Sequence, residues 1–233
     1  MARRKSTNGR CEFCEGVFSK AAMSRHLAQC PQRAKQAEPP KAGSKAVRWW
    51  TLKVEGRHSP QYWMHLEIAS SADLVDLDDF LRDTWLECCG HLSDFRIDGR
   101  TYGDVDDEFG FELDMLPMED PKLDKLFREG MVFFHTYDYG STTELRLEVL
   151  GSREGKPVRG KLIRLLARNL MPENKCDCGK EATLVCSFCH PERGCWVCDD
   201  CADEHDCDSG CGSEGLLPVM NSPRVGVCAY GAV

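Results

Sequence analysis

The 233-residue sequence has no run of about 18 apolar residues, so no segment has the composition of a membrane span. Its basic start, residues 1–10, has no apolar stretch behind it, so we expect no secretory signal and a cytoplasmic protein without membrane contact. Motifs of P-loop enzymes, GxSxG hydrolases, HExxH metalloproteases and dinucleotide-binding enzymes are also missing. We therefore predict that the protein is not an enzyme, and we infer no small-molecule substrate.

Charge is divided unevenly along the chain. Residues 1–48 contain eleven Lys or Arg against three Glu, a formal charge of +8, whereas the whole chain carries −8 and the remainder therefore −16. Residues 73–129 hold eighteen Asp or Glu against six Lys or Arg. This asymmetry predicts a basic arm attached to an acidic body. Residues 35–47 are rich in Pro, Ala and Lys without apolar periodicity, which predicts a flexible linker between the two.

Cysteine is the residue present in unusual excess. Three of the 15 cysteines lie in residues 11–30, two are adjacent at 88–89, and ten lie in residues 176–228. Disulfides are rare in a reducing compartment, where clustered cysteines more often bind metal. Cys-x2-Cys spacing also places two thiolates on one tight turn, within reach of a tetrahedral ion. The clusters at both ends therefore predict zinc, and we expect three ions per chain.

A zinc-finger pattern occupies residues 1–34. A hairpin supplies two ligands, and a helix beginning near Ser19 carries the other two on one face, above a small core of Phe18 and Met23. So short a segment cannot bury enough surface to fold alone, so zinc binding must supply the folding free energy, on the order of 10 kcal/mol. The linker leads us to expect that this finger folds in isolation from the rest. Its ligands, which resemble the Cys-Cys-His-Cys variant of the classical finger, are Cys11, Cys14, His26 and Cys30.

The finger has three possible roles, which the sequence leaves open. Basic side chains that can neutralise phosphates favour nucleic-acid binding within residues 1–48, but the helix offers few base-reading groups. The alternatives are a protein partner and a purely structural role. The candidate phosphate-binding residues are Arg3, Arg4, Lys5, Lys20 and Arg25.

The C-terminal region, residues 156–233, predicts a module with two metal ions. Its order of ligand pairs is similar to that of cross-brace interaction modules, in which pairs one and three share one ion and pairs two and four the other. Cys195 and Cys211 are possible replacements for a neighbouring ligand, and Cys228 is a free thiol or a late ligand. The four pairs are Cys176 with Cys178, Cys186 with Cys189, Cys198 with Cys201, and His205 with Cys207.

Residues 48–155 predict a central α+β domain. Alternating apolar and polar residues indicate half-buried strands, and apolar residues at helical spacing indicate a helix that Ser71 or Asp73 caps. The expected elements are strands at 50–55 and 62–68, a helix over 74–88, a strand at 95–97, a helix over 121–129, and a hairpin of 131–137 and 142–150.

Motifs in this domain resemble a known family. They are Trp85-Leu-Glu-Cys-Cys-Gly-His-Leu-Ser93, Phe95-Arg-Ile-Asp-Gly-Arg-x-Tyr-Gly103 and Phe133-x-x-x-Tyr137-Asp138-Tyr139-Gly140. They are similar to the Ri-plasmid ORF-three-like family, whose relatives include TnpR-like passenger proteins of bacterial insertion sequences. The resemblance runs from about residue 49 to the C-terminus, and the finger lies outside it. It implies a compact, grasp-like α+β fold and a mobile-element setting, but no settled activity.

Three further patterns in the central domain have simpler explanations than a site. Cys88, Cys89 and His91 are explained by core packing and a helix end at Gly90. Residues 104–110 do not fit a calcium loop, because glycine and the final glutamate are misplaced. The carboxylates of residues 73–129 form a solvated acidic face.

These observations favour a non-enzymatic zinc-binding protein that acts as an interaction or adaptor protein. A nucleic-acid-binding accessory factor anchored by residues 1–48 is the alternative.

Overall fold

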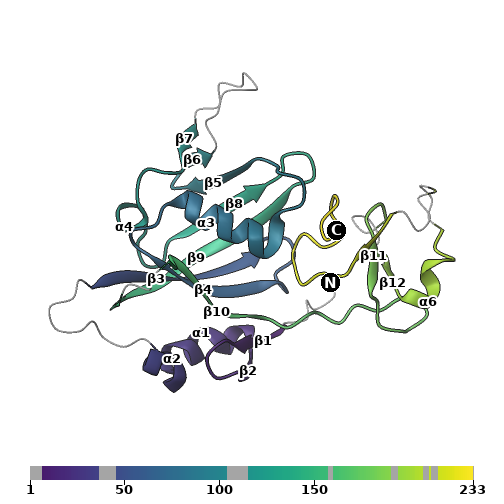
Figure 1. The fold of residues 1–233 in the computed structure, drawn as a ribbon, viewed down its shortest axis with the longest axis horizontal. Coiled ribbons are helices and arrows are strands. Elements are labelled where there is room, and N and C mark those ends of the chain that lie inside the picture. The colour runs from purple at the N-terminus through teal and green to yellow at the C-terminus, as the bar shows by residue number, and fades with distance from the viewer. Residues whose placement is uncertain are drawn as a thin grey trace.

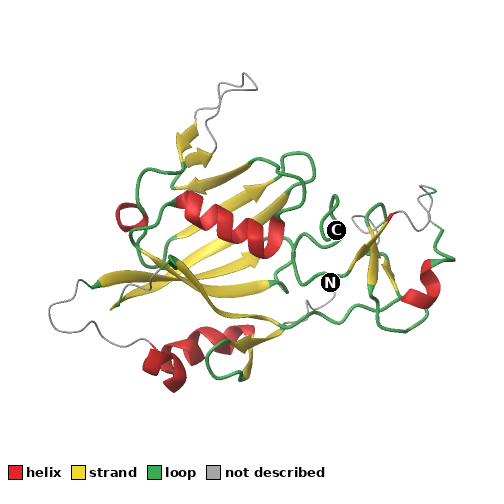
Figure 2. Ribbon diagram, in the orientation of Figure 1, coloured by secondary structure: helices red, strands yellow, loops and turns green. Residues whose placement is uncertain are grey.

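The computed structural model describes residues 7–36, 46–103, 115–156, 160–189, 194–206, 210 and 215–232. Within these ranges the protein is α+β, with a large mixed sheet, a small second sheet and few helices (Figures 1 and 2). The large sheet has the strand order β2-β1-β10-β4-β3-β9-β8-β5-β6-β7, and the small one β12-β11-β13. None of the helices in the described ranges is long and apolar enough to cross a bilayer.

The strands of the large sheet pair antiparallel, except for the parallel pair β6 and β7. Its strands are β1 Asn8–Cys11, β2 Val17–Ser19, β3 Val47–Gly56, β4 Trp63–Ala69, β5 Ser93–Ile97, β6 Arg100–Gly103, β7 Met115–Pro117, β8 Val132–Tyr137, β9 Thr143–Gly155 and β10 Ile163–Asn169. The small sheet consists of β11 Leu184–Cys186, β12 Trp196–Val197 and β13 Leu216–Pro218. The helices are α1 Lys20–Gln29, α2 Pro31–Gln36, α3 Leu74–Leu81, the π-helix η1 Arg82–Leu86, α4 Leu123–Leu126 and α6 Asp199–Ala202.

The helix α3 lies where its apolar stripe predicts, and η1 extends it. Asp73 is the N-cap, and it forms a capping box with Asp76 because each side chain accepts a hydrogen bond from the other's backbone. Leu77, Leu81 and Trp85 are fully buried against the sheet. The second predicted helix is much shorter than expected, since α4 covers only Leu123–Leu126.

The strand β4 is buried on both faces, which its alternating sequence did not predict. Met64, Leu66 and Ile68 face the core beneath α3, as expected of a half-buried strand. The opposite face is also buried, although it carries the polar residues His65 and Glu67. A second layer therefore covers this side of the sheet.

That layer is the N-terminal finger, which the predicted linker does not keep apart from the rest of the chain. Its strand β1 pairs with β10 and so extends the large sheet. Met23 and Leu27 of α1 pack with Trp63 and Leu166 of the sheet. Figure 1 shows α1 and α2 on one side of the sheet and α3 on the other. Of the predicted linker, residues 37–45 lie outside the described residues.

The C-terminal part also joins the central domain more closely than a boundary at residue 156 implies. The strand β10 belongs to the large sheet, where it pairs with both β1 and β4. The chain then forms the small sheet and returns to the end of η1, where Ser222 Oγ donates to the Trp85 carbonyl at 2.6 Å. The predicted module is thus the segment from 174 to about 218, between two segments anchored in the body.

Candidate metal centres

The four predicted ligands of the finger come together in the structure. Cys11 ends β1, Cys14 lies in the following turn, His26 is in α1 and Cys30 caps its C-terminus. Ser19 is the N-cap, as predicted, and its hydroxyl accepts a hydrogen bond from the Ala22 N–H at 3.3 Å. All four ligand atoms lie within 4.8 Å of one another.

The surroundings of His26 suit a metal ligand. Its ring stacks on Phe18, with 3.8 Å between ring centroids, and its Nε2 lies 3.3 Å from Cys14 Sγ. Burial lowers the pKa of His26, which favours the neutral imidazole that coordinates metal. The predicted core is present as well, because Met23 is fully buried and Phe18 packs beside it.

The first C-terminal group combines pairs one and three, as the cross-brace order predicts. Its members Cys176, Cys178, Cys198 and Cys201 have sulfur atoms within 4.8 Å of one another. Cys178 Sγ and Cys198 Sγ are 3.5 Å apart. Backbone N–H groups of Cys178 and Cys198 hydrogen-bond to Cys176 and lower the pKa of its thiol to about 6, which favours the thiolate.

The second C-terminal group contains Cys186, Cys189 and His205, from pairs two and four. Its predicted fourth ligand, Cys207, lies outside the described residues, as does the candidate Cys211. His205 Nε2 is buried without a hydrogen-bond partner in the described structure, which suits a nitrogen that coordinates an ion. Cys195, the other candidate replacement, does not belong to any of the groups in the described ranges.

Two findings support metal binding over disulfides. No disulfide bond forms among the thirteen cysteines of the described ranges. The finger group and both C-terminal groups also have only thiol and imidazole side chains as donors, the combination typical of structural metal sites.

The predicted phosphate-binding residues of the finger are only partly available. Lys20 Nζ donates to the Pro60 carbonyl at 2.8 Å and forms an ion pair with Glu55, so it is occupied within the protein. Arg25 is exposed. Arg3, Arg4 and Lys5 lie outside the described residues.

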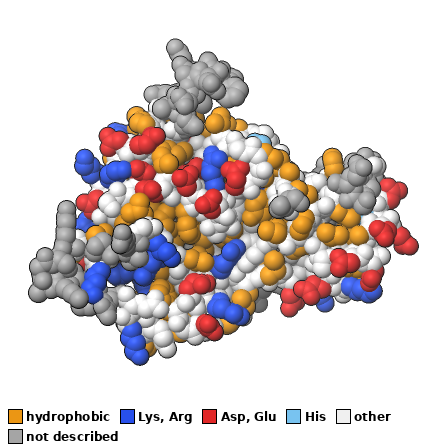
Figure 3. All heavy atoms as spheres, viewed as in Figure 1, with side chains coloured by type: hydrophobic (Ala, Val, Ile, Leu, Met, Phe, Trp, Pro, Cys, Tyr) orange, Lys and Arg blue, Asp and Glu red, His pale blue; other side chains and the backbone are white. Residues whose placement is uncertain are grey.

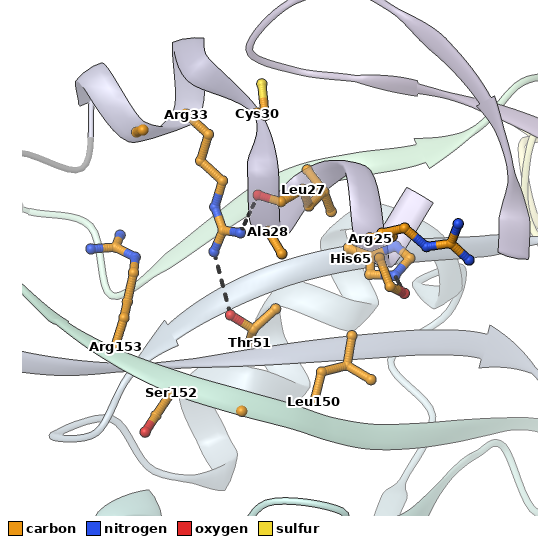
Figure 4. Close-up of a pocket in the computed structure, with 13 residues that line it drawn as sticks. Arg25, Leu27, Ala28, Cys30, Arg33, Thr51, His65, Leu150, Ser152 and Arg153 are labelled. Atoms are coloured by element: carbon orange, nitrogen blue, oxygen red, sulfur yellow. Dashed lines mark hydrogen bonds between the residues drawn. The ribbon is translucent and has the colours of Figure 1, made fainter. Parts of the chain in front are cut away.

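A cavity of about 660 Å³ lies between the finger and the sheet (Figure 4). Its lining includes Arg25 and Arg33 on the finger side and Thr51, His65 and Arg153 on the sheet side. Arg33 Nη1 donates to the Leu27 carbonyl at 2.8 Å, and its Nη2 lies 3.5 Å from Thr51 Oγ1, contacts that join α2 to α1 and to β3.

Beside this cavity, Glu67 is the centre of a buried ion network. Arg153 donates to both carboxylate oxygens at 2.7 Å, Arg164 donates to one at 2.9 Å, and Arg33 contacts the same carboxylate from the finger. Burial alone would raise the pKa of Glu67, but hydrogen bonds from Arg153 and Arg33 lower it to about 2. The carboxylate is therefore charged, and its ion pair with Arg33 joins α2 to the sheet, whereas Arg153 and Arg164 belong to the sheet itself.

His65, next to this network, is neutral. Burial, together with the nearby charges of Lys53 and Arg33, lowers its pKa to about 3. Its Nε2 lies 2.8 Å from Ser24 Oγ of α1. Sequence reasoning missed His65 and Glu67, because on an amphipathic strand they look like the solvent-facing side.

Two acidic residues of the region 73–129, Asp78 and Asp94, depart from the predicted solvated face because they are buried. Asp78 of α3 is buried, and its carboxylate lies 2.6 Å from His135 Nε2 and 2.7 Å from Arg82 Nε. Residues 104–110 lie outside the described residues.

A fourth group of ligand atoms was not expected. Cys88, Cys89 and His91, explained above by packing and a helix end, lie with Cys228 in one cluster whose ligand atoms are within 4.8 Å of one another. The packing explanation holds for Cys88, which touches the core. It does not account for the position of the other three side chains, and the missing partner was Cys228 from the far end of the chain.

Comparison with known proteins identifies the central region. A family model described as plasmid pRiA4b ORF-3-like protein matches residues 50–182. Among solved structures, a protein of unknown function from Methanosarcina mazei Go1 aligns with a TM-score of 0.44 and 17% identity, over 52% of this chain and 68% of that one. No curated protein matches the sequence.

Proposed function

This chain belongs to the plasmid pRiA4b ORF-3-like family, and we propose that it is a non-enzymatic zinc protein that binds a protein partner through its C-terminal module. The family takes its description from a plasmid reading frame, which supports the mobile-element setting that we propose for this chain. A reducing, cytoplasmic location is part of the proposal, since thiolate ligands persist there.

Zinc is the metal that we propose for the finger group and the two C-terminal groups. Thiolate and imidazole donors in sets of four are its usual ligands in structural sites. The finger and the first C-terminal group each bring four such donors together. For the second C-terminal group we propose Cys207 as the fourth ligand beside Cys186, Cys189 and His205.

The donor sets also support a structural role over a catalytic one. A zinc ion with four protein ligands has no open position for water or substrate. Each set joins segments that the chain separates: Cys176 and Cys178 precede β11, whereas Cys198 and Cys201 follow β12. The ions would thus stabilise the arrangement of the small sheet and of the finger.

The exposed side chain of Phe188 is the observation that carries the partner proposal. It lies between the ligands Cys186 and Cys189 and is 60% exposed, the highest value among the large apolar side chains of the described ranges. Metal ligands on both sides hold this turn in place, and exposed aromatic residues are enriched at protein interfaces. Figure 3 shows acidic side chains along the outer edge of the same module, which argues against nucleic acid as its ligand.

Site-specific photo-crosslinking in cells tests this proposal. The full chain carries benzoylphenylalanine at position 188 or, as a matched control, at position 132, where Val132 is a 40% exposed apolar residue on β8. We expect one protein to crosslink from position 188 and not from 132, and Cys189→Ser, which removes a ligand beside Phe188, to abolish that crosslink. Equal crosslinking from both positions, or none from 188, would contradict the proposal.

Nucleic-acid binding by residues 1–48 is the second candidate function. Their formal charge of +8 and the exposed position of Arg25 support it. The engagement of Lys20 with Glu55 and Pro60 counts against that residue as a phosphate ligand.

A further inference from the structure

The end of η1 and the C-terminal segment meet at the cluster of Cys88, Cys89, His91 and Cys228. The π-helix ends at Leu86, and Gly90 turns the chain with a φ of +72° before His91. Cys228 arrives from the opposite end of the chain and itself has a positive φ of 54°. A non-glycine residue in this region is uncommon, so its position depends on surrounding contacts.

The separations within the cluster match those of a tetrahedral zinc site. With Zn–S near 2.3 Å and Zn–N near 2.0 Å, tetrahedral geometry places two sulfurs about 3.8 Å apart and a sulfur and a nitrogen about 3.5 Å apart. Cys89 Sγ and Cys228 Sγ are 3.9 Å apart, and Cys228 Sγ lies 3.6 Å from His91 Nε2. A disulfide would require the two sulfurs to approach to about 2.05 Å, whereas a metal ion requires almost no movement.

Buried groups hold the cluster from behind. Arg224 is fully buried, and its Nη2 lies 3.3 Å from Cys88 Sγ and 2.7 Å from Asp138 Oδ2. Its Nη1 donates to the Ser141 carbonyl at 2.9 Å, so the guanidinium is fixed in place. Three thiolates and a divalent ion sum to −1, a charge that a neighbouring arginine stabilises.

The histidine is oriented as well. The His91 ring meets the Tyr137 ring edge to face, with centroids 5.7 Å apart, and the His91 backbone N–H donates to the Tyr137 hydroxyl at 3.3 Å. Such contacts outside the ligand set orient the ring that coordinates an ion.

We propose that Cys88, Cys89, His91 and Cys228 bind one further zinc ion, which joins the C-terminal segment to the end of η1. Cys89 and Cys228 are exposed, so this ion exchanges with solvent more readily than the ion in the finger, where Cys11 and Cys30 are buried. The proposal stands apart from the proposed function, since it concerns other residues and needs no partner.

Native mass spectrometry of the full, reduced chain loaded with zinc tests the fourth site by differences. We expect Cys89→Ser and Cys228→Ser each to lose one ion relative to the parent protein, and the double variant to lose the same single ion. Combining Cys228→Ser with Cys14→Ser should lose two, because these ligands belong to separate groups. Ala229→Ser, beside Cys228, is the matched control and should lose none.

Each single variant is compared with the parent in number of bound zinc ions. This difference does not depend on how many ions the other three groups bind. Cys89 is exposed, and circular dichroism of Cys89→Ser should match the parent, which excludes unfolding as the cause of the loss. Unchanged zinc content in both single variants would overturn the proposal. So would a Cys89–Cys228 disulfide in place of the ion in the protein as isolated under reducing conditions.

Discussion

The two terminal regions that could bind metal have similar sets of Cys and His side chains but differ in what lies around them. The finger contributes two strands to the large sheet and covers the polar face of β4, so its helix and its basic residue Lys20 are engaged within the protein. The C-terminal module forms a sheet of its own and leaves Phe188 and its acidic edge exposed. Cys and His spacing thus indicates a candidate metal-binding module but does not say whether the module serves the fold or a partner.

Removal of the finger's metal is expected to have the largest effect. In Cys14→Ser the finger loses folding free energy on the order of 10 kcal/mol, and water reaches His65 and Glu67 on β4. Hydrogen exchange should therefore lose protection in β4 and β10 as well as in residues 8–36. Cys176→Ser is the control and should leave β4 protected; loss confined to the finger would show that its docking is not needed by the sheet.

Neutralising the buried carboxylate that joins the two layers comes next. Glu67→Gln leaves Arg33, Arg153 and Arg164 without their counter-ion, and breaking a buried ion pair costs about 3–5 kcal/mol. Urea denaturation at pH 7 measures the loss. Glu148→Gln, in the half-exposed pair with Arg146, should cost less than about 1 kcal/mol.

The stability difference between the parent protein and Glu67→Gln should depend on pH with a definite sign. The pKa of Glu67 falls from 4.5 to about 2 on folding, so its contribution is present above pH 4.5 and is lost as the pH falls toward 2. The stability difference between the parent and Glu67→Gln should shrink over that interval. A difference that stays constant between pH 5 and pH 2 would argue against a charged Glu67.

A smaller effect is expected where β1 approaches the sheet. A Cβ at Gly9 would overlap the Trp63 ring and lie 2.5 Å from the Arg168 carbonyl, so Gly9→Ala should cost about 1–3 kcal/mol by overpacking. Gly140→Ala is the control, because its Cβ meets only Asp138 Oδ1, at 3.4 Å. Thermal unfolding gives the melting temperatures of both variants, and we expect that of Gly9→Ala to be lower. Equal melting temperatures would contradict the close approach of β1 to Trp63.

The smallest effect concerns nucleic acid. If the finger contacts phosphates, Arg25→Ser should reduce the slope of log affinity against log salt by about 0.9 on duplex DNA, whereas Lys20→Met should leave the slope unchanged and lower the stability. Titrations of the full chain at two salt concentrations distinguish them. Absence of binding by the parent protein would assign the finger to the fold alone.

Much of the fold and of the finger's ligand set was predictable, because the signals are local. The capped apolar stripe of α3 and the strands β3, β8 and β9 lie where periodicity predicts, and the family match confirms the resemblance drawn from the motifs. His26 and Cys30 are one helical turn apart, and Cys11 and Cys14 share one tight turn, so backbone geometry alone brings each pair together.

Local sequence patterns were enough to predict contacts between residues a few positions apart, whereas the surroundings of each module depend on how the whole chain packs. His65 and Glu67 alternate with apolar residues as solvent-facing residues do, and they are buried because α1 and α2 cover them. Cys89 and Cys228 are 139 residues apart, so no spacing rule connects them. Their meeting depends on Arg224 and Ser222, which anchor the returning chain at Asp138 and at the end of η1, and such long-range contacts follow from packing of the whole chain.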